Sequence, residues 1–181
     1  MIARAIVEQC EGLNVNTLFT YGGPHMGFST YKKCDHWWCP VFYRIAGYVT
    51  EYVLDLNIIA PSDYATPYFN LARGTDKPTF LPELNNGTLG NLTNFAMFMW
   101  NDDTQIQPKE SSWFWQYDSQ GSLVKLRDSD VYKEDRIGLK KLDEAGGLWF
   151  YHGNGAHMDL EDEYIDKYLV PFLRGEEPWP S

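Results

Sequence analysis

The stretch "FAMFMWNDD", residues 95–103, is a continuous apolar run of strand length that ends at two aspartates. A strand inside a parallel sheet is covered by helices on both faces, so it is apolar at every position rather than at alternate ones. A second run, "LWFY" at 148–151, leads into the glycine-rich loop "HGNGAH" at 152–157. The two stretches predict an α/β fold in which polar groups follow the ends of two buried strands.

The flanking sequence alternates between helical and extended patterns. Apolar spacing predicts helices at 1–10, 41–54, 134–146 and 160–173, and further strands at 16–22 and 112–117. Residues 55–94 are rich in Pro, Asn and Gly and have weak periodicity, which is typical of a cap rather than of a sheet. We therefore expect one mainly parallel sheet, in a chain whose 181 residues are enough for a domain with its own core.

Charge and hydropathy exclude several classes of partner. The formal net charge of −10 would be repelled by nucleic acid, so no nucleic-acid partner is expected. No apolar run approaches the roughly 20 residues that a transmembrane helix needs. The sequence indicates neither a cofactor nor a resident metal ion, and we expect none.

The three cysteines leave more than one interpretation open. Cys34 and Cys39 are close enough in "KKCDHWWCP" for a short-loop disulfide, and Cys10 is then left over. Cys10 could instead be an ordinary buried thiol. A metal site built from Cys34, His36 and Cys39 is a further alternative, although its spacing matches no standard zinc pattern.

Two glycosylation sequons, at Asn86 and Asn91, point to a secretory compartment when taken with a cysteine pair. The start of the chain does not resemble a signal peptide, since Arg4 and Glu8 interrupt its apolar residues. A chain that lacks its beginning would account for the sequons, the odd cysteine and the missing signal together. The alternative is that the sequons arise by chance.

The acids and histidines at the two strand ends suggest catalysis. In open α/β sheets, sites form beyond the carboxyl ends of the strands. Asp102 and Asp103 follow one strand, and His152 and His157 follow the next, which is the acid-then-histidine order of α/β-hydrolases. There the imidazole takes a proton from a hydroxyl nucleophile and the carboxylate orients the imidazole. The nucleophile motif G-x-S-x-G is absent, and Ser29 in "GFSTY" lacks the second glycine.

Several motifs together resemble the palmitoyl-protein thioesterases, lysosomal hydrolases that remove long fatty acyl groups from cysteine thioesters. "SSWFWQYD" is similar to the family's S-x-W-F-x-x-Y segment, and "VYKEDRIGLKKLDEAGGLWFY" to its Y-x-x-D-x-[IL]-G-L-K-x-[ML]-D-x-A-G-x-L stretch. "GAHMDL" matches its G-x-H loop, "YLVPFL" its final helix, and "IARAIVEQC" and "NTLFTYGGPHMG" a helix and strand near the start. The resemblance covers nearly the whole chain and is weakest across 55–94.

The resemblance implies a role for individual residues. It selects His157 as the catalytic histidine and Asp103 as the acid, because Asp103 precedes Pro108 by the family's interval; Asp102 remains the alternative. It pairs Cys34 with Cys39 in a disulfide, and it places the partner of Cys10 upstream of this chain. The serine of the family's G-F-S-Q-G-G motif and the oxyanion hole have no counterpart here, so the expectation is an N-terminally incomplete chain that is inactive alone.

The resemblance also implies an architecture and a substrate. Residues 1–181 would form the C-terminal portion of an α/β-hydrolase sheet, and residues 24–94 a helical or irregular cap insertion that holds the acyl chain. The expected substrate is an S-acylated protein or peptide, in a lysosomal or secretory location. The alternatives are a non-catalytic remnant or lipid-binding fragment, and a lipase or esterase of the same fold.

The cysteine pairing can be tested by mass. Alkylation of the denatured, unreduced chain should modify one thiol, that of Cys10, if Cys34 and Cys39 are bridged. Intact-mass measurement counts the modified thiols. Three modified thiols in protein from an oxidising compartment would contradict the pairing.

Overall fold

A computed structural model describes residues 2–10, 12–27, 84, 89–118 and 120–176 of the chain. The predicted helix at 41–54, the Cys34 and Cys39 pair with His36, the sequon at Asn86, Ser29 and most of the predicted insertion lie outside the described residues. In the part of the chain that is described, no helix has the length and hydropathy to cross a bilayer.

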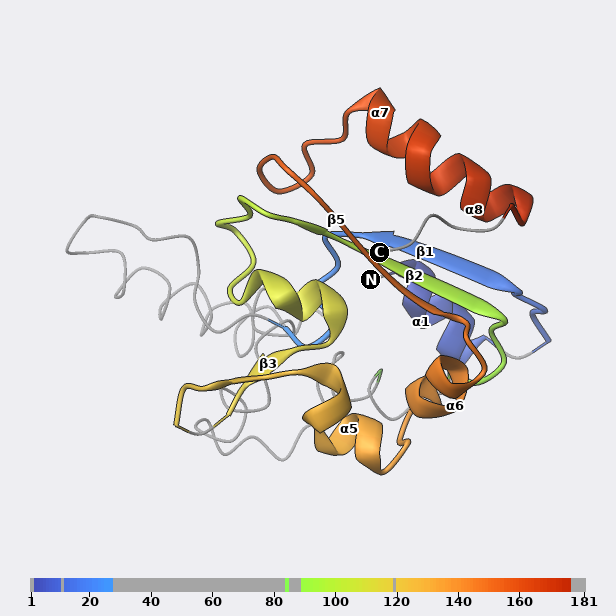
Figure 1. Ribbon diagram of the computed structural model, residues 1–181. Helices are drawn as coiled ribbons and strands as arrows, with labels where there is room; N and C mark the ends of the chain where they lie inside the picture. Colours follow the sequence, from blue (N-terminus) through green and yellow to red (C-terminus); the bar gives the residue numbers. More distant parts are fainter. Residues whose placement is uncertain (1, 11, 28–83, 85–88, 119, 177–181) are drawn as a thin grey trace, which may run out of the picture.

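A parallel sheet of three strands forms the centre of the molecule (Figure 1). Its order is β1-β2-β5, with β1 at Thr17–Tyr21, β2 at Asn94–Trp100 and β5 at Leu148–Gly153. Both pairings are parallel, and Phe98 of β2 lies in register with residues of both neighbours. The strands predicted at 16–22, 95–100 and 148–151 are confirmed, as is the mainly parallel α/β architecture.

Helices cover both faces of this sheet, as Figure 1 shows. Helix α1 (Ile2–Gln9) and helix α6 (Leu139–Glu144) lie on one side, and the helical C-terminal segment lies on the other. The remaining elements are η3 (Lys109–Trp113), β3 (Gln116–Tyr117), β4 (Leu123–Val124), η4 (Leu126–Asp128) and α5 (Asp130–Lys133).

The apolar run that predicts β2 is buried on both faces of the sheet. Phe95 and Met97 belong to one apolar cluster, which also contains α6 residues, and both are fully buried. Phe98 and Trp100 belong to a second cluster on the other face, together with Phe172 near the C-terminus. A strand covered on both faces has no solvent-facing position to make polar, which explains its continuous apolar sequence.

The predicted strand at 112–117 is wrong over most of its length. Residues Lys109–Trp113 form the 3-10 helix η3, and only Gln116–Tyr117 is extended, in a two-stranded antiparallel ribbon with β4. The segment braces the loop after β1, since Ser111 accepts hydrogen bonds from the amides of His25 and Met26. The aromatic residues of this run therefore pack in and around a 3-10 helix and do not form a strand of the central sheet.

The C-terminal helix is confirmed, with one irregular turn. It consists of α7 (Asp162–Tyr164), the π-helical η5 (Ile165–Leu169) and α8 (Val170–Arg174). Pro171 has no amide hydrogen to donate to the preceding turn, and π-turns commonly occur where regular helical bonding is interrupted. The helix still packs Phe172 onto the sheet.

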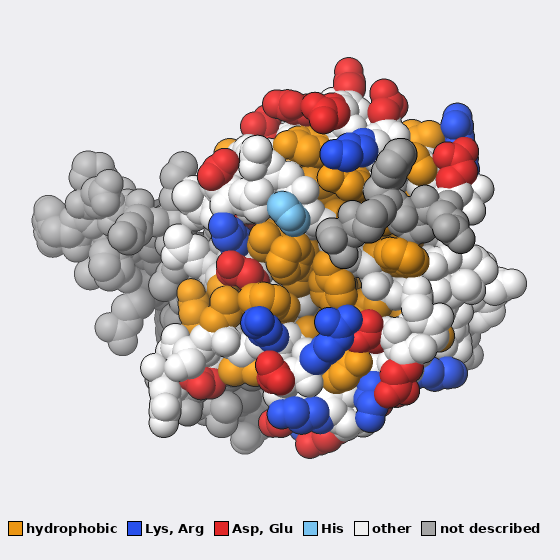
Figure 2. Space-filling view, in the orientation of Figure 1, with side chains coloured by type: hydrophobic (Ala, Val, Ile, Leu, Met, Phe, Trp, Pro, Cys, Tyr) orange, Lys and Arg blue, Asp and Glu red, His pale blue; other side chains and the backbone are white. Residues whose placement is uncertain are grey.

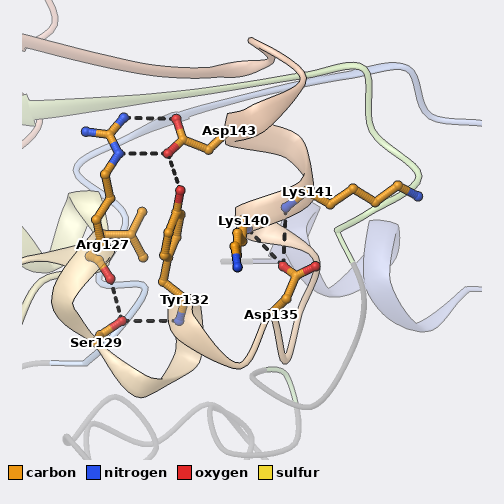
Figure 3. A network of polar contacts seen from close by, with 8 residues as sticks. Arg127, Ser129, Tyr132, Asp135, Lys140, Lys141 and Asp143 are labelled. Atoms are coloured by element: carbon orange, nitrogen blue, oxygen red, sulfur yellow. Dashed lines mark hydrogen bonds and ion pairs between the residues drawn. The ribbon is translucent and has the colours of Figure 1, made fainter.

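A polar network fixes the segment between β4 and β5 (Figure 3). Asp143 of α6 accepts two hydrogen bonds from Arg127, at 2.7 and 2.9 Å, and one from the Tyr132 hydroxyl at 2.6 Å. The Asp135 carboxylate accepts the Lys140 amide at 2.9 Å and so ties the turn to the first residues of α6. The helix predicted at 134–146 is therefore shorter than expected, because an ordered turn occupies its first residues.

The one fully buried residue of α1 is charged, although Val7 also packs against the core. Ile2 and Ile6, whose spacing predicts this helix, are 64% and 44% exposed, whereas Arg4 is fully buried. Arg4 forms an ion pair with Glu8 and donates to the backbone carbonyl of His25 at 3.3 Å. Burial lowers the pKa of the Arg4 guanidinium and raises that of the Glu8 carboxyl, and their mutual attraction opposes both shifts.

His25 is fully buried beside this ion pair. Its Nε2 lies 3.0 Å from the Thr20 hydroxyl, and its ring stacks on Phe114 with the ring centroids 4.6 Å apart. Burial, and then the positive charge of Arg4, lower the pKa of His25 well below its ordinary value. The imidazole is therefore neutral in the folded chain.

His25 should make the fold sensitive to acid. The unfolded chain binds a proton at His25 below about pH 6.5, while the folded chain does not, so stability is full above that pH and falls below it. At about 1.4 kcal/mol per pH unit, the loss between pH 6.5 and pH 5 is at most about 2 kcal/mol. Urea denaturation at the two pH values should show this loss in the parent chain and a smaller one in His25→Gln.

A matched control is His152→Gln, which replaces an exposed histidine. It should keep the pH dependence of the parent chain. An unchanged pH dependence in His25→Gln would contradict the neutral, buried state of His25.

Candidate active site

The carboxyl ends of the three parallel strands meet at one edge of the sheet, and the candidate residues follow these ends. Gly22 comes directly after β1, Asp102 and Asp103 come two and three residues after the end of β2, and His157 lies in the loop after β5. The loop is held to β2 by the amide of Asn101, which donates to the Gly153 carbonyl at 2.8 Å. This edge is the usual position for a site in an open α/β sheet.

His157 and Asp103 contact each other directly. The Nδ1 atom of His157 lies 2.7 Å from Oδ2 of Asp103, although 54 residues separate them in the sequence. The Asp103 side chain is 1% exposed, while that of His157 is 20% exposed. The pair thus combines a buried carboxylate with an imidazole that solvent or a substrate can reach.

The surroundings of Asp103 keep its carboxylate ionised. Burial by itself would raise the pKa, but the hydrogen bond with His157 and those from the amides of Ile106 and Gln105 outweigh it and lower the pKa below its ordinary value. The two amides lie 3.0 and 2.8 Å from Oδ1. Because both amides donate to Oδ1, the second oxygen, Oδ2, remains free to accept a hydrogen bond from the imidazole.

The tautomer of His157 follows from the charge on Asp103. An ionised carboxylate can only accept, so Nδ1 carries the hydrogen and donates it. In the neutral imidazole, Nε2 then has no hydrogen and can accept a proton. The arrangement is that of a general base held by an acid, which can deprotonate a hydroxyl group placed near Nε2.

Asp102 has a different set of contacts. Its side chain is exposed, and its Oδ2 accepts the Gly155 amide at 3.2 Å. Its own amide donates to the Gly155 carbonyl at 3.1 Å. Gly155 has φ +115, a conformation that other residues rarely adopt. Asp102 therefore anchors the loop that carries His157, and it is Asp103 that reaches the imidazole.

The other sequence candidates lie apart from this pair. His152 is exposed, and its Nδ1 lies 3.3 Å from the side-chain amide of Asn101. Cys10 is a free, exposed thiol, and Asn91 is exposed. The described residues contain no cluster of three or more His, Cys, Asp or Glu side chains that could hold a metal ion.

The two amides that donate to the Asp103 carboxylate were not predicted from the sequence. Asp residues commonly accept hydrogen bonds from the amides two and three positions later, and Gln105 and Ile106 occupy these positions. The same rule could have favoured Asp103 over Asp102. It requires knowing that the chain turns at Asp103, which the strand pattern does not show.

An aromatic groove lies on the outside of the sheet, away from the candidate pair. It has a volume of about 410 Å³ and is lined by aromatic, aliphatic and charged side chains, namely Trp113, Trp115, Lys125, Leu126, Arg127, Asp128 and Phe150. Figure 2 shows apolar side chains across the middle of the face on which β5 lies, with charged side chains around them. Neither His157 nor Asp103 lines the groove, so the structure gives no reason to assign it to catalysis.

The distinct contacts of the two aspartates can be tested. In Asp102→Ala, the Gly155 amide loses an acceptor, which should cost up to about 1 kcal/mol and speed the hydrogen exchange of that amide. Asp102→Asn keeps an acceptor oxygen and serves as the control. The NMR signal of the His157 Nδ1 hydrogen should persist in Asp102→Ala and disappear in Asp103→Ala. The reverse result would make Asp102 the partner of the imidazole.

Comparison with known proteins identifies the family of the chain. The sequence model of the palmitoyl protein thioesterase family matches residues 1–157. The chain is 27% identical to palmitoyl-protein thioesterase 1 of Caenorhabditis elegans over 92% of this chain, and 26% identical to palmitoyl-protein thioesterase 3 of Dictyostelium discoideum over 96%. It is 30% identical to lysosomal thioesterase PPT2-B of Xenopus laevis over 94% of this chain.

The match extends over a part of each relative. The chain covers 62% of the length of the C. elegans protein and 65% of each of the other two. The family model, by contrast, spans most of the chain, from its first residue to the histidine that contacts Asp103. The parallel sheet with its covering helices is consistent with part of an α/β-hydrolase fold. The chain belongs to the palmitoyl protein thioesterase family.

Proposed function

We propose that this chain supplies the general base and its orienting acid in a thioesterase that removes long-chain acyl groups from S-acylated proteins. The observation that carries the proposal is the 2.7 Å contact between His157 Nδ1 and Asp103 Oδ2 at the carboxyl edge of the sheet. Family membership supports the reaction class. The geometry supports the division of roles between the two residues.

In this mechanism, His157 moves a proton in each half of the reaction. Nε2 takes the proton from a hydroxyl nucleophile as its oxygen attacks the thioester carbonyl, and the ionised Asp103 stabilises the resulting imidazolium. The carbon–sulfur bond then breaks, and the imidazolium gives its proton to the departing sulfur. In the second half, Nε2 takes a proton from water, the water oxygen attacks the acyl ester, and the proton returns to the nucleophile oxygen as the fatty acid leaves.

We infer that the nucleophile is not among residues 1–181. The family motif G-F-S-Q-G-G does not occur in them, and Ser29 in "GFSTY" lacks the second glycine of G-x-S-x-G. The oxyanion donors of such sites include the residue after the serine, so they are inferred to lie outside as well. The 181-residue chain by itself should therefore not hydrolyse acyl thioesters.

The proposed location is lysosomal or secretory. One relative is named a lysosomal thioesterase, and the sequon residue Asn91 is exposed, as an acceptor of glycan must be. A disulfide between Cys34 and Cys39 and glycosylation at Asn86 belong to the same proposal. We also assign the acyl chain to residues 24–94, whose aromatic side chains offer apolar area worth about 0.8 kcal/mol for each buried CH₂.

Hydrolysis of a palmitoyl thioester tests the proposal. The purified 181-residue chain should show no turnover above the uncatalysed rate. A fusion that adds an N-terminal segment containing the family motif G-F-S-Q-G-G should hydrolyse the thioester. In this fusion, Asp103→Asn should lower kcat by roughly 10⁴-fold, because the wrong imidazole tautomer is then favoured. His157→Ala should reduce activity at least as far.

The fusion also provides the control. His152→Ala removes the neighbouring, exposed histidine and should leave kcat within about twofold of the parent fusion. Faster hydrolysis of a matched oxygen ester than of the thioester would indicate a lipase or esterase. Turnover by the 181-residue chain that depends on Ser29 would contradict the proposed origin of the nucleophile.

A further inference from the structure

Gly22 lies against the imidazole of His157. A Cβ atom added at Gly22 would be 3.1 Å from Cε1 of His157 and 3.3 Å from Nδ1, the nitrogen that contacts Asp103. Carbon atoms in favourable contact are about 3.5–4.0 Å apart, so a methyl group would overlap the ring. A side chain at Gly22 would therefore force the imidazole to shift from its observed position by a few tenths of an ångström.

Moving the backbone of Gly22 away from the ring would break a hydrogen bond that links the end of β1 to β2. Its amide donates to the Phe98 carbonyl at 2.8 Å and so continues the pairing of β1 with β2. Its φ of +55 lies in the left-handed region, which turns the chain sharply at the end of β1. The contact with His157 therefore comes from a position that the parallel sheet fixes.

The side chain on the other side of Gly22 is equally fixed. The Cβ position at Gly22 is 3.4 Å from Cδ1 of Trp100, which is fully buried. The indole ring packs against Phe98, Tyr21 and Tyr164, with centroids 4.7, 6.2 and 5.3 Å away. Because Trp100 is enclosed by these rings, any added atom at Gly22 would displace the partly exposed imidazole instead.

We propose that Gly22, backed by Trp100, is a positioning residue that seats the His157 imidazole and keeps its Nδ1 directed at Asp103. The inference rests on the proposed function, in which His157 is the base. This contact surface of Gly22 and Trp100, called the seat below, limits the imidazole to one orientation. In that orientation Nε2 is the nitrogen that can accept a proton. Neither Gly22 nor Trp100 takes part in proton transfer itself.

NMR of the unmodified 181-residue chain gives the first test, and it does not depend on hydrolysis. The Hα atoms of Gly22 and the Hε1 of His157 should show a nuclear Overhauser contact, and the ¹⁵N shifts of the imidazole should report a hydrogen on Nδ1. Absence of the Overhauser contact in the folded chain would overturn the proposal, whatever the variants do.

Alanine substitution gives the second test. Gly22→Ala should abolish or shift the hydrogen-bonded Nδ1 signal of His157, because the methyl group forces the ring to move by a few tenths of an ångström. Gly146→Ala is the matched control, since Gly146 has φ +77 and no atom within 4 Å of its Cβ position. It carries the same left-handed strain without the contact and should keep the signal.

The outcomes separate the seat from general destabilisation. Loss of the signal in a folded Gly22→Ala chain, with the signal kept in Gly146→Ala, supports the proposal. Retention in both variants, or loss in both, would contradict it. A failure of the fusion enzyme to hydrolyse thioesters would refute the proposed function while leaving these NMR results unchanged, so the two inferences can fail separately.

Discussion

The parallel pairing of β2 with both of its neighbours is the constraint on which the site depends. Since all three strands run the same way, the loops that follow them meet at one edge, and residues from positions 22, 103 and 157 become neighbours. β2 is apolar on both faces, so a shift of its register by one residue would still leave every side chain buried. Burial alone therefore does not select the register of β2. The hydrogen bonds of β2 with β1 and β5 determine its register, and the register determines which residues lie next to each other at the site.

Within that frame, the charge on Asp103 decides the chemistry. A carboxylate this deeply buried would ordinarily take up a proton, because losing water disfavours its charged form. Two backbone amides and the imidazole of His157 replace the lost water. The turn after β2 therefore does more than change the chain direction: its amides keep the acid ionised, and the ionised acid selects the tautomer of His157.

The sequence predicts most of the scaffold and only part of the site. Apolar stretches identify all three strands, and the pattern is clearest for β2, which is buried along most of its length, whereas β1 and β5 are only partly buried. The same pattern fails at 112–117, where aromatic residues brace a loop as a 3-10 helix, because hydrophobicity alone does not distinguish these uses. Acid and histidine are found from their order, but the seat at Gly22 is not, since a contact between residues 22 and 157 depends on how the strands pair.

Polar contacts of Arg4, together with the packing of Val7 on the core, determine how α1 is placed on this scaffold. The Arg4 guanidinium pairs with Glu8 in the same helix and donates to the His25 carbonyl in the loop after β1. Such a pair contributes little net stability, since desolvation offsets its attraction, but losing one partner costs about 3–5 kcal/mol. Rotating α1 by one residue would keep Arg4 beside Glu8 but would take the pair away from the His25 carbonyl, so this contact favours one placement of the helix. Because Gly22 lies in the same loop as His25, the contacts that place α1 also hold the glycine beneath the imidazole of His157.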